Sequence, residues 1–177
     1  MTTGACLSFQ CLFGLPVRNK TRNALMQADP DHAEGYMSRA HSLLDGLAAL
    51  DASYTQTLAS CVHTQFVTTH AAYGYVALRY GLTQIPIEGL SSEAEPTPSD
   101  LADIAREVKA LGLGWVLVEP ALSPRFAETL ASEDNLQLRA IHPIESVTEQ
   151  ELSDFHDYMG LMQDNLDALS TALECAS

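Results

Sequence analysis

The chain has 177 residues, of which 46% are hydrophobic, and a mean hydropathy close to zero, which is the composition of an ordinary globular domain. Its 23 acidic and 9 basic residues give a formal net charge of −14. Phosphate binding needs clustered Lys and Arg side chains, so we expect no nucleic-acid partner.

Residues 1–28 are expected to be an atypical N-terminal segment. The apolar run near its start is short, is interrupted by Gln10 and Gly14, and has its basic residues after it rather than before it, unlike a signal peptide. No stretch of the chain is apolar for long enough to span a membrane. As written, the sequence predicts no signal peptide and therefore a cytoplasmic location.

The four cysteines, Cys6, Cys11, Cys61 and Cys175, give little guidance on cross-linking. They contain no CxxC pair and no spacing typical of a zinc knuckle. The sequence does not favour a structural disulfide, and the redox compartment stays open.

Residues 29–62 are expected to form one long helix, which Asp29 or Asp31 on either side of Pro30 would cap. About thirty residues at a rise of 1.5 Å give a length of about 45 Å, which suits a strut between two lobes. A single apolar stripe follows from steps of three and four between Tyr36, Ala40, Leu43, Leu47, Leu50, Tyr54 and Leu58.

Residues 63–177 alternate between strands and helices. Strands are predicted over 65–70, 83–90, 115–120 and 137–143, and helices over 71–81, 101–112, 123–133 and 148–175. Ser99 is expected to cap the second of these helices, and Thr148 with Glu151 has the spacing of a capping box for the last. Pro86 suggests either an edge strand or a bulge. The predicted fold class is α/β, a four-stranded parallel sheet flanked by helices and preceded by the long helix.

Four side chains that can bind metal stand at the ends of these strands: His70, Glu88, Glu119 and His142. Ligands of parallel sheets bind beyond the carboxyl ends of the strands, where these residues would meet. Taken singly, each also suits an ordinary polar strand end. Together they predict a metal site in which His70 and His142 bind Zn²⁺, since imidazole nitrogen is a preferred zinc donor, and the carboxylates bind metal or orient an imidazole.

The remaining histidines and the enzyme motifs add no second site. His32, His41, His63 and His156 are interpreted as surface or partly packed residues. The sequence contains no GxGxxG, GxxxxGK[ST] or GxSxG motif, so we expect no enzyme. A less favoured hypothesis is a small α/β enzyme with His70 as base and Glu119 as its partner, although no nucleophile accompanies them.

The order of several segments resembles a known family. They are VTTHAAYGYVALRYGL, IEGLSSEAEPTPSDLADI, WVLVEPALSPRFAETLA, HPIE and DYMGLMQDNLDALSTAL. From about Ala28 onward the chain is similar to the C-terminal lobe of the zinc/manganese-binding (cluster A-I) periplasmic solute-binding proteins of bacterial ABC transporters. In that family two α/β lobes are joined by one long rigid helix, and the protein delivers metal to a membrane permease. The resemblance therefore implies a periplasmic metal-binding protein.

The resemblance also implies roles for single residues. His70 corresponds to a metal ligand of the second lobe, and His142 stands where the last ligand is usually an aspartate. Glu119 matches a position near the site and would support a ligand rather than bind metal. Two imidazoles favour Zn²⁺, with Mn²⁺ as the less favoured ion because manganese suits oxygen donors.

The chain departs from the family pattern in two respects. The first lobe should supply the other ligands, but residues 1–28 contain no histidine, and only 17–30 resemble the end of that lobe's final helix. The usual disulfide partner of a C-terminal cysteine falls near Trp115, which would leave Cys175 single. We expect a remnant of the first lobe over 1–28, a linker helix over 29–62 and a C-terminal metal-binding lobe over 63–177.

An alternative reading is a truncated structural module without metal-binding activity of its own. The linker helix, without a first lobe beside it, would expose its apolar stripe and drive self-association.

Overall fold

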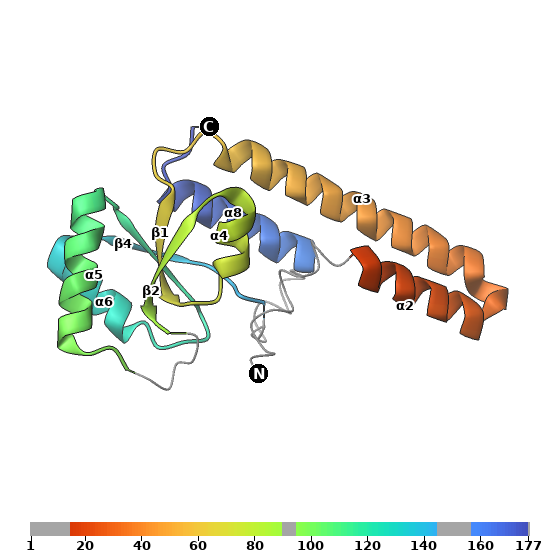
Figure 1. The fold of residues 1–177 in the computed structure, drawn as a ribbon, viewed down its shortest axis with the longest axis horizontal. Helices are drawn as coiled ribbons and strands as arrows, with labels where there is room; N and C mark the ends of the chain where they lie inside the picture. Colours follow the sequence, from red (N-terminus) through yellow and green to blue (C-terminus); the bar gives the residue numbers. More distant parts are fainter. Residues whose placement is uncertain (1–14, 90–94, 145–156, 177) are drawn as a thin grey trace.

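The computed structural model describes residues 15–89, 95–144 and 157–176. An α/β lobe carries a projecting pair of helices (Figure 1). In chain order the elements are α2 (Leu15–Ala28), η1 (Pro30–His32), α3 (Ala33–Leu58), β1 (Gln65–His70), α4 (Gly74–Tyr80), β2 (Thr83–Glu88), α5 (Pro98–Leu111), β3 (Trp115–Val118), α6 (Arg125–Asp134), β4 (Gln137–Ala140) and α8 (Tyr158–Ala172).

The strands form one parallel sheet in the order β2-β1-β3-β4. This confirms the predicted fold class. Pro86 lies in the edge strand β2, as expected, where a residue without an amide proton costs no ladder hydrogen bond on the solvent side. The central strands β1 and β3 are buried on both faces, so their apolar runs do not alternate with polar residues.

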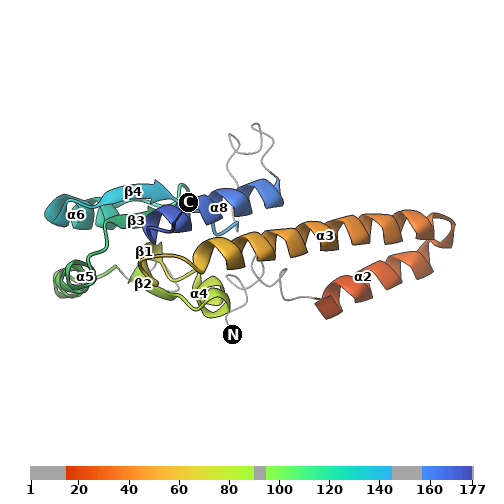
Figure 2. The same ribbon diagram turned by 90° about the horizontal axis from the view of Figure 1, so that it is seen from above.

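Helices cover both faces of the sheet (Figure 2). On one face α5 and α6 pack over a core that includes Val67, Val108 and Val116. On the other face α4, α8 and the C-terminal half of α3 enclose a larger core that includes Phe66 and Leu117. Successive residues of a strand point to opposite faces, so β1 and β3 each contribute to both cores.

The helix α3 lies in two different environments. It has 26 residues, fewer than the predicted range of 29–62, and the short 3₁₀ helix η1 precedes it. Its four buried residues, Leu47, Leu50, Tyr54 and Leu58, all lie in its C-terminal half. The N-terminal half runs beside α2 and projects away from the lobe as a helical hairpin (Figures 1 and 2).

The predicted start of α3 is not capped by a side-chain hydrogen bond to the backbone. The Asp29 carboxylate instead accepts from the Tyr36 hydroxyl at 2.9 Å and contacts His32 Nδ1 at 2.9 Å. These bonds lower the pKa of Asp29, with the contact from His32 as the largest cause.

Two further helix starts differ from the prediction. The helix α5 begins at Pro98 with Thr97 and Asp100 in a capping box, which places Ser99 inside the helix, since Pro is favoured at the first helical position. The helix α8 begins at Tyr158 because Asp157 is extended and accepts from Gly160 N at 2.9 Å. A continuous helix over 148–175 is therefore wrong. Thr148, Glu151 and His156 lie outside the described residues.

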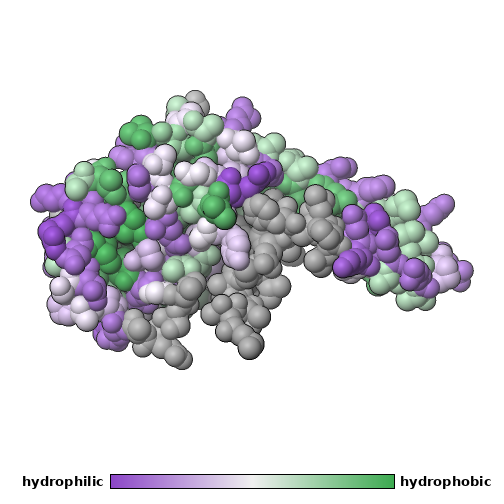
Figure 3. Space-filling model, viewed as in Figure 1, coloured by the Kyte–Doolittle hydropathy of each residue, from purple (hydrophilic) through white to green (hydrophobic). Residues whose placement is uncertain are grey.

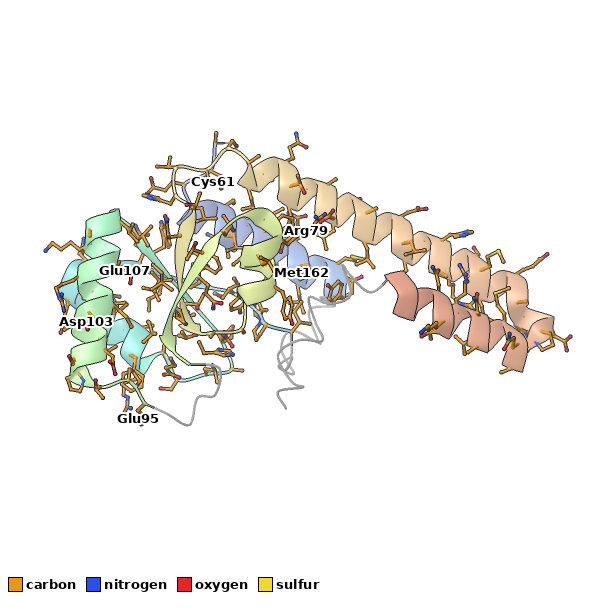
Figure 4. All side chains as sticks on the ribbon, in the orientation of Figure 1. Cys61, Arg79, Glu95, Asp103, Glu107 and Met162 are labelled. Carbon is orange, nitrogen blue, oxygen red and sulfur yellow. A yellow bond between two sulfur atoms is a disulfide. The ribbon has the colours of Figure 1, made fainter. Side chains whose placement is uncertain are left out.

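The helix α4 is held against α3 by a charged contact. Arg79, labelled in Figure 4, donates to the Asp51 carboxylate at 2.7 Å, and the Tyr80 hydroxyl donates to the same carboxylate at 2.9 Å. The Arg79 guanidinium is the main reason that the pKa of Asp51 lies below its usual range. This contact fixes the helix that begins shortly after His70.

A disulfide joins Cys61, just after α3, to Cys175, just after α8 (Figure 4). The expectation that Cys175 is single is therefore wrong. The two ends also share backbone hydrogen bonds, among them Val62 N to Glu174 O at 3.3 Å and Ala176 N to Ser60 O at 3.1 Å. The fold thus brings together cysteines that are 114 residues apart, which spacing alone could not reveal. Cys6 and Cys11 lie outside the described residues.

Among the described residues, no helix combines the length and the apolar character that crossing a lipid bilayer requires.

Replacing either cysteine with Ser removes the same cross-link. We expect C61S, C175S and C61S/C175S each to lower the free energy of unfolding by a similar amount, about 2–5 kcal/mol, because a long loop regains entropy in the unfolded chain. Urea unfolding followed by circular dichroism measures the loss. A double variant that loses the sum of the two single losses would contradict a bond between these cysteines.

Candidate metal site

The four predicted site residues lie in strand order along one edge of the sheet. His70 at the end of β1 is the register partner of Glu88 at the end of β2. Glu119 directly follows β3, and Ile141 N donates to Val118 O at 2.9 Å, so His142 comes one residue after the last backbone bond between β3 and β4. The topology therefore places them in the order Glu88, His70, Glu119, His142.

The His70 and Glu119 side chains are in direct contact. His70 Nδ1 meets Glu119 Oε1, and the side chains are 13% and 3% exposed. Both residues continue the strand face that Phe66 and Leu117 occupy in the larger core. With Nδ1 against a carboxylate, Nε2 is the ring nitrogen on the far side, and metal-binding histidines commonly place one ring nitrogen beside a carboxylate in this way.

The backbone after His70 is held by a glutamine of the edge strand. Gln84 Nε2 donates to His70 O at 2.8 Å and to Thr68 Oγ1 at 2.7 Å. Gln84 Oε1 accepts from Tyr73 N at 3.1 Å. One side chain thus bridges the end of β1 and the start of α4. Sequence reasoning missed Gln84, because a polar residue of an edge strand carries no distinctive signal.

The backbone of His142 is held by a buried asparagine of α8. His142 N donates to Asn165 Oδ1 at 2.7 Å, and Asn165 Nδ2 donates to His142 O at 2.7 Å. Asn165 is 1% exposed. Sequence reasoning missed this residue as well, although an asparagine beside the apolar stripe of the last helix was a visible signal.

Glu88, at the end of the edge strand β2, borders a hollow that α6 also lines. With Thr69, Leu122 and Phe126 it lines a hollow of about 340 Å³, which the ion pair between Glu95 and Arg125 also borders. Burial raises the pKa of Glu88, while the charge of His70 acts in the opposite direction. Glu88 is therefore near enough to His70 for the two side chains to interact electrostatically.

The structure brings together only part of the predicted site. Among residues 15–89, 95–144 and 157–176, no three His, Cys, Asp or Glu side chains form a group that could hold a metal ion. His70 has Glu119 beside it, whereas His142 does not join them in such a group. The arrangement can offer one oriented imidazole, with a second imidazole farther along the same edge.

The other described histidines lie elsewhere. His32 contacts Asp29 on the projecting hairpin, and His41 is exposed on α3. His63 precedes β1, at the opposite end of that strand from His70, and lies 4.0 Å from a Glu174 carboxylate oxygen. Within the described chain, none of the three is close to the strand ends that carry the candidate site.

Residues 17–172 match the family model of the zinc-uptake complex component A, periplasmic. The zinc-binding protein AdcA of Streptococcus pyogenes serotype M6 is 35% identical over 162 residues, which cover 92% of this chain and 32% of that protein. The high-affinity zinc uptake system protein ZnuA of Bacillus subtilis is 34% identical over 157 residues, which cover 89% of this chain and 49% of that protein. The chain thus spans between about a third and a half of these relatives.

Solved structures of zinc-binding and metal-dependent proteins are also similar to this chain. The Zn(II)-bound ZnuA-like domain of Streptococcus pneumoniae AdcA has a TM-score of 0.72 and 34% identity, over 86% of this chain and 57% of that one. The metal-dependent lipoprotein YcdH of Bacillus subtilis has a TM-score of 0.74 and 32% identity, with the same coverage. The fold and the sequence therefore point to the same group of proteins.

The buried contact between His70 and Glu119 can be tested without any ligand. We expect H70A to lower the free energy of unfolding by about 3–5 kcal/mol, because it leaves the Glu119 carboxylate buried and unpaired. The double variant H70A/E119Q should recover part of that loss. Urea unfolding in the presence of a chelator measures the free energy of unfolding of the unaltered chain, H70A, E119Q and H70A/E119Q, which together form a double-mutant cycle.

The exposed ion pair between Arg106 and Asp103 provides the control cycle, since its side chains are 77% and 61% exposed. Solvent screening should leave it without measurable coupling. Equal coupling energies in the two double-mutant cycles would show that His70 does not stabilise the buried Glu119 side chain.

Proposed function

Because the chain belongs to the family of the periplasmic zinc-uptake complex component A, we propose that it binds Zn²⁺ for an ABC-type metal importer, and that His70 and His142 are its metal ligands. The observation that carries the proposal is the buried contact between His70 Nδ1 and Glu119 at the carboxyl end of a central strand. That contact leaves Nε2 as the nitrogen that can face a cation.

The donor set favours zinc. Imidazole is a preferred zinc ligand, whereas manganese suits carboxylates, carbonyls and water. Glu119 acts through His70 rather than as a ligand, since its Oε1 is occupied by the imidazole. Two histidines fill two of the four positions that zinc usually takes, and water or donors beyond the described residues complete the set.

The proposed partners are the metal ion and the membrane permease of the importer. The proposed domain division keeps residues 29–62 as a linker and 63–177 as the metal-binding lobe.

The proposed location is outside the cytoplasm. The Cys61–Cys175 disulfide supports this location, because such bonds persist in oxidising compartments. Two similar proteins are lipoproteins, the zinc-binding lipoprotein AdcA of Streptococcus pneumoniae and the metal-dependent lipoprotein YcdH of Bacillus subtilis, which agrees with a location outside the cytoplasm. The family is one of zinc uptake and not of enzymes, so the hypothesis of a His70 base is set aside.

Calorimetric titration of Zn²⁺ at neutral pH tests the two ligands. We expect H70A/H142A to bind zinc at least about tenfold more weakly than the unaltered chain, because both nitrogen donors are lost. Below about pH 6 binding by the unaltered chain should also weaken, since zinc needs neutral imidazoles and histidine titrates near pH 6.5. Mn²⁺ should bind more weakly than Zn²⁺.

The matched control is H63A, because the His63 side chain is 16% exposed and that of His70 is 13% exposed, yet His63 lies at the other end of β1. It should leave zinc affinity unchanged. Circular dichroism confirms that each variant folds. Equal affinities of the unaltered chain and H70A/H142A would overturn the ligand assignment.

A second candidate function, self-association through the α2–α3 hairpin, is favoured by its exposed apolar side chains. Leu25, Met37 and Leu43 are 43%, 41% and 48% exposed. A groove of about 320 Å³ lies between the two helices and is lined by Leu25, Tyr36 and Leu43, among others. Figure 3 shows apolar residues among the polar ones on this projecting hairpin. A second copy of the hairpin could cover these side chains.

Sedimentation velocity tests self-association. We expect dimers of the unaltered chain and a shift to monomers for L25E/L43E, since charges at both positions would oppose burial of the groove. The variant V62E is the control, because Val62 is 72% exposed and lies away from the hairpin. Monomers of the unaltered chain at every concentration would overturn this candidate.

A further inference from the structure

His142 lies where the sheet stops supplying backbone partners. The strand β4 ends at Ala140 and β3 ends at Val118, and beyond them Ile141 N still donates to Val118 O at 2.9 Å. The amide and carbonyl of His142 are instead bound by the single side chain of Asn165, both at 2.7 Å. A side-chain amide has a donor and an acceptor side by side, so it can take the place of the next residue of a neighbouring strand.

We infer that Asn165 is a positioning residue for the metal ligand His142, an inference that rests on the proposed function. Binding both the N–H and the C=O of one residue fixes the peptide planes on either side of its Cα. The direction of the Cα–Cβ bond is then fixed, and the imidazole is left with only its side-chain rotations. Pro143 restricts the backbone of His142 further, since a residue before proline avoids the helical region.

The helix α8 is a rigid support for this contact. Met162, Leu166 and Leu169 are each at most 2% exposed and anchor α8 in the larger core. Asparagine is a poor helix former, and burying its amide is costly unless every polar group is satisfied. Asn165 directs its oxygen and its nitrogen to the same residue, so the two bonds hold that residue rather than the helix.

The backbone immediately after His142 is unusual. Ile144 has a φ of 61°, a conformation that a β-branched residue rarely adopts. Such a conformation persists only where the surrounding structure holds it. The double contact between His142 and Asn165 lies two residues before Ile144 and holds the chain on that side of it.

The two predicted ligands are held in related ways. The carbonyl of His70 accepts from Gln84 Nε2 at 2.8 Å, as that of His142 accepts from Asn165 Nδ2. His70 also contacts Glu119 through its ring. Its orientation therefore has support from the side chain and from the backbone, and the backbone of His142 is held by its two bonds to Asn165. Loss of Asn165 should therefore release the His142 backbone and leave the contacts of His70 with Gln84 and Glu119 in place.

The test combines zinc affinity with residue-resolved NMR. N165L replaces the amide with an apolar group of similar size, and L169A is the matched control because Leu169 is as buried on the same helix but has no amide to bind the His142 backbone. We expect N165L to bind Zn²⁺ about tenfold or more weakly, as is usual when a residue that supports a ligand is lost. On addition of zinc the His70 ring signals should still shift, whereas those of His142 should not. L169A should lose stability but keep both responses.

The possible failures are distinguishable. If neither ring responds to zinc in the unaltered chain, the proposed function fails and the positioning role fails with it. If both rings respond equally in the unaltered chain and in N165L, at equal affinity, the positioning role is overturned and the proposed function stands.

Amide hydrogen exchange in the unaltered chain tests the contact between His142 and Asn165 without any variant. The His142 amide, although outside β4, should exchange as slowly as the amides of the strand. Exchange at the rate of an exposed loop would overturn the contact with Asn165, whether or not N165L folds.

Discussion

The buried carboxylate of Glu119 is the constraint on which the site depends. A charge that is only 4% exposed is costly unless a partner compensates it, and that partner is His70 of the neighbouring strand. The pairing requires β1 and β3 to be adjacent and in a register that brings their ends together on one face. It also requires the core that Phe66 and Leu117 build below the two side chains. The geometry of His70 is therefore a consequence of the whole sheet.

Much of this arrangement could be predicted because it follows from local patterns. Strand β1 ends at His70 in the structure as in the prediction, and continuous apolar runs identified the buried strands. The rule that ligands bind at the carboxyl ends of parallel strands then selected His70, Glu88, Glu119 and His142, of which the structure brings the side chains of His70 and Glu119 into contact. The resemblance to zinc-binding proteins independently implied that His70 is a metal ligand.

The parts that were missed depend on contacts between distant segments. The Cys61–Cys175 bond joins residues 114 apart in sequence, and the contacts of Asn165 with His142 span 23 residues. No local periodicity reports such pairs. The error at the start of α5 was of another kind, because Thr97 and Ser99 are both good caps and the choice between them depended on Pro98 at the first helical position.

The last helix links these non-local contacts. At its C-terminal end the disulfide and the bond from His63 N to Leu173 O tie α8 to the segment that leads into β1. In its middle, Asn165 holds the residue after β4, while Met162 O accepts from the buried Tyr54 hydroxyl of α3 at 2.6 Å. The helix α8 therefore contacts both the segment that leads into the strand of His70 and the loop that carries His142, while the sheet joins the two strands directly. If His70 and His142 bind one ion as proposed, the distance between them decides whether both nitrogens can reach it, so the contacts of α8 bear on the proposed site as those of the strands do.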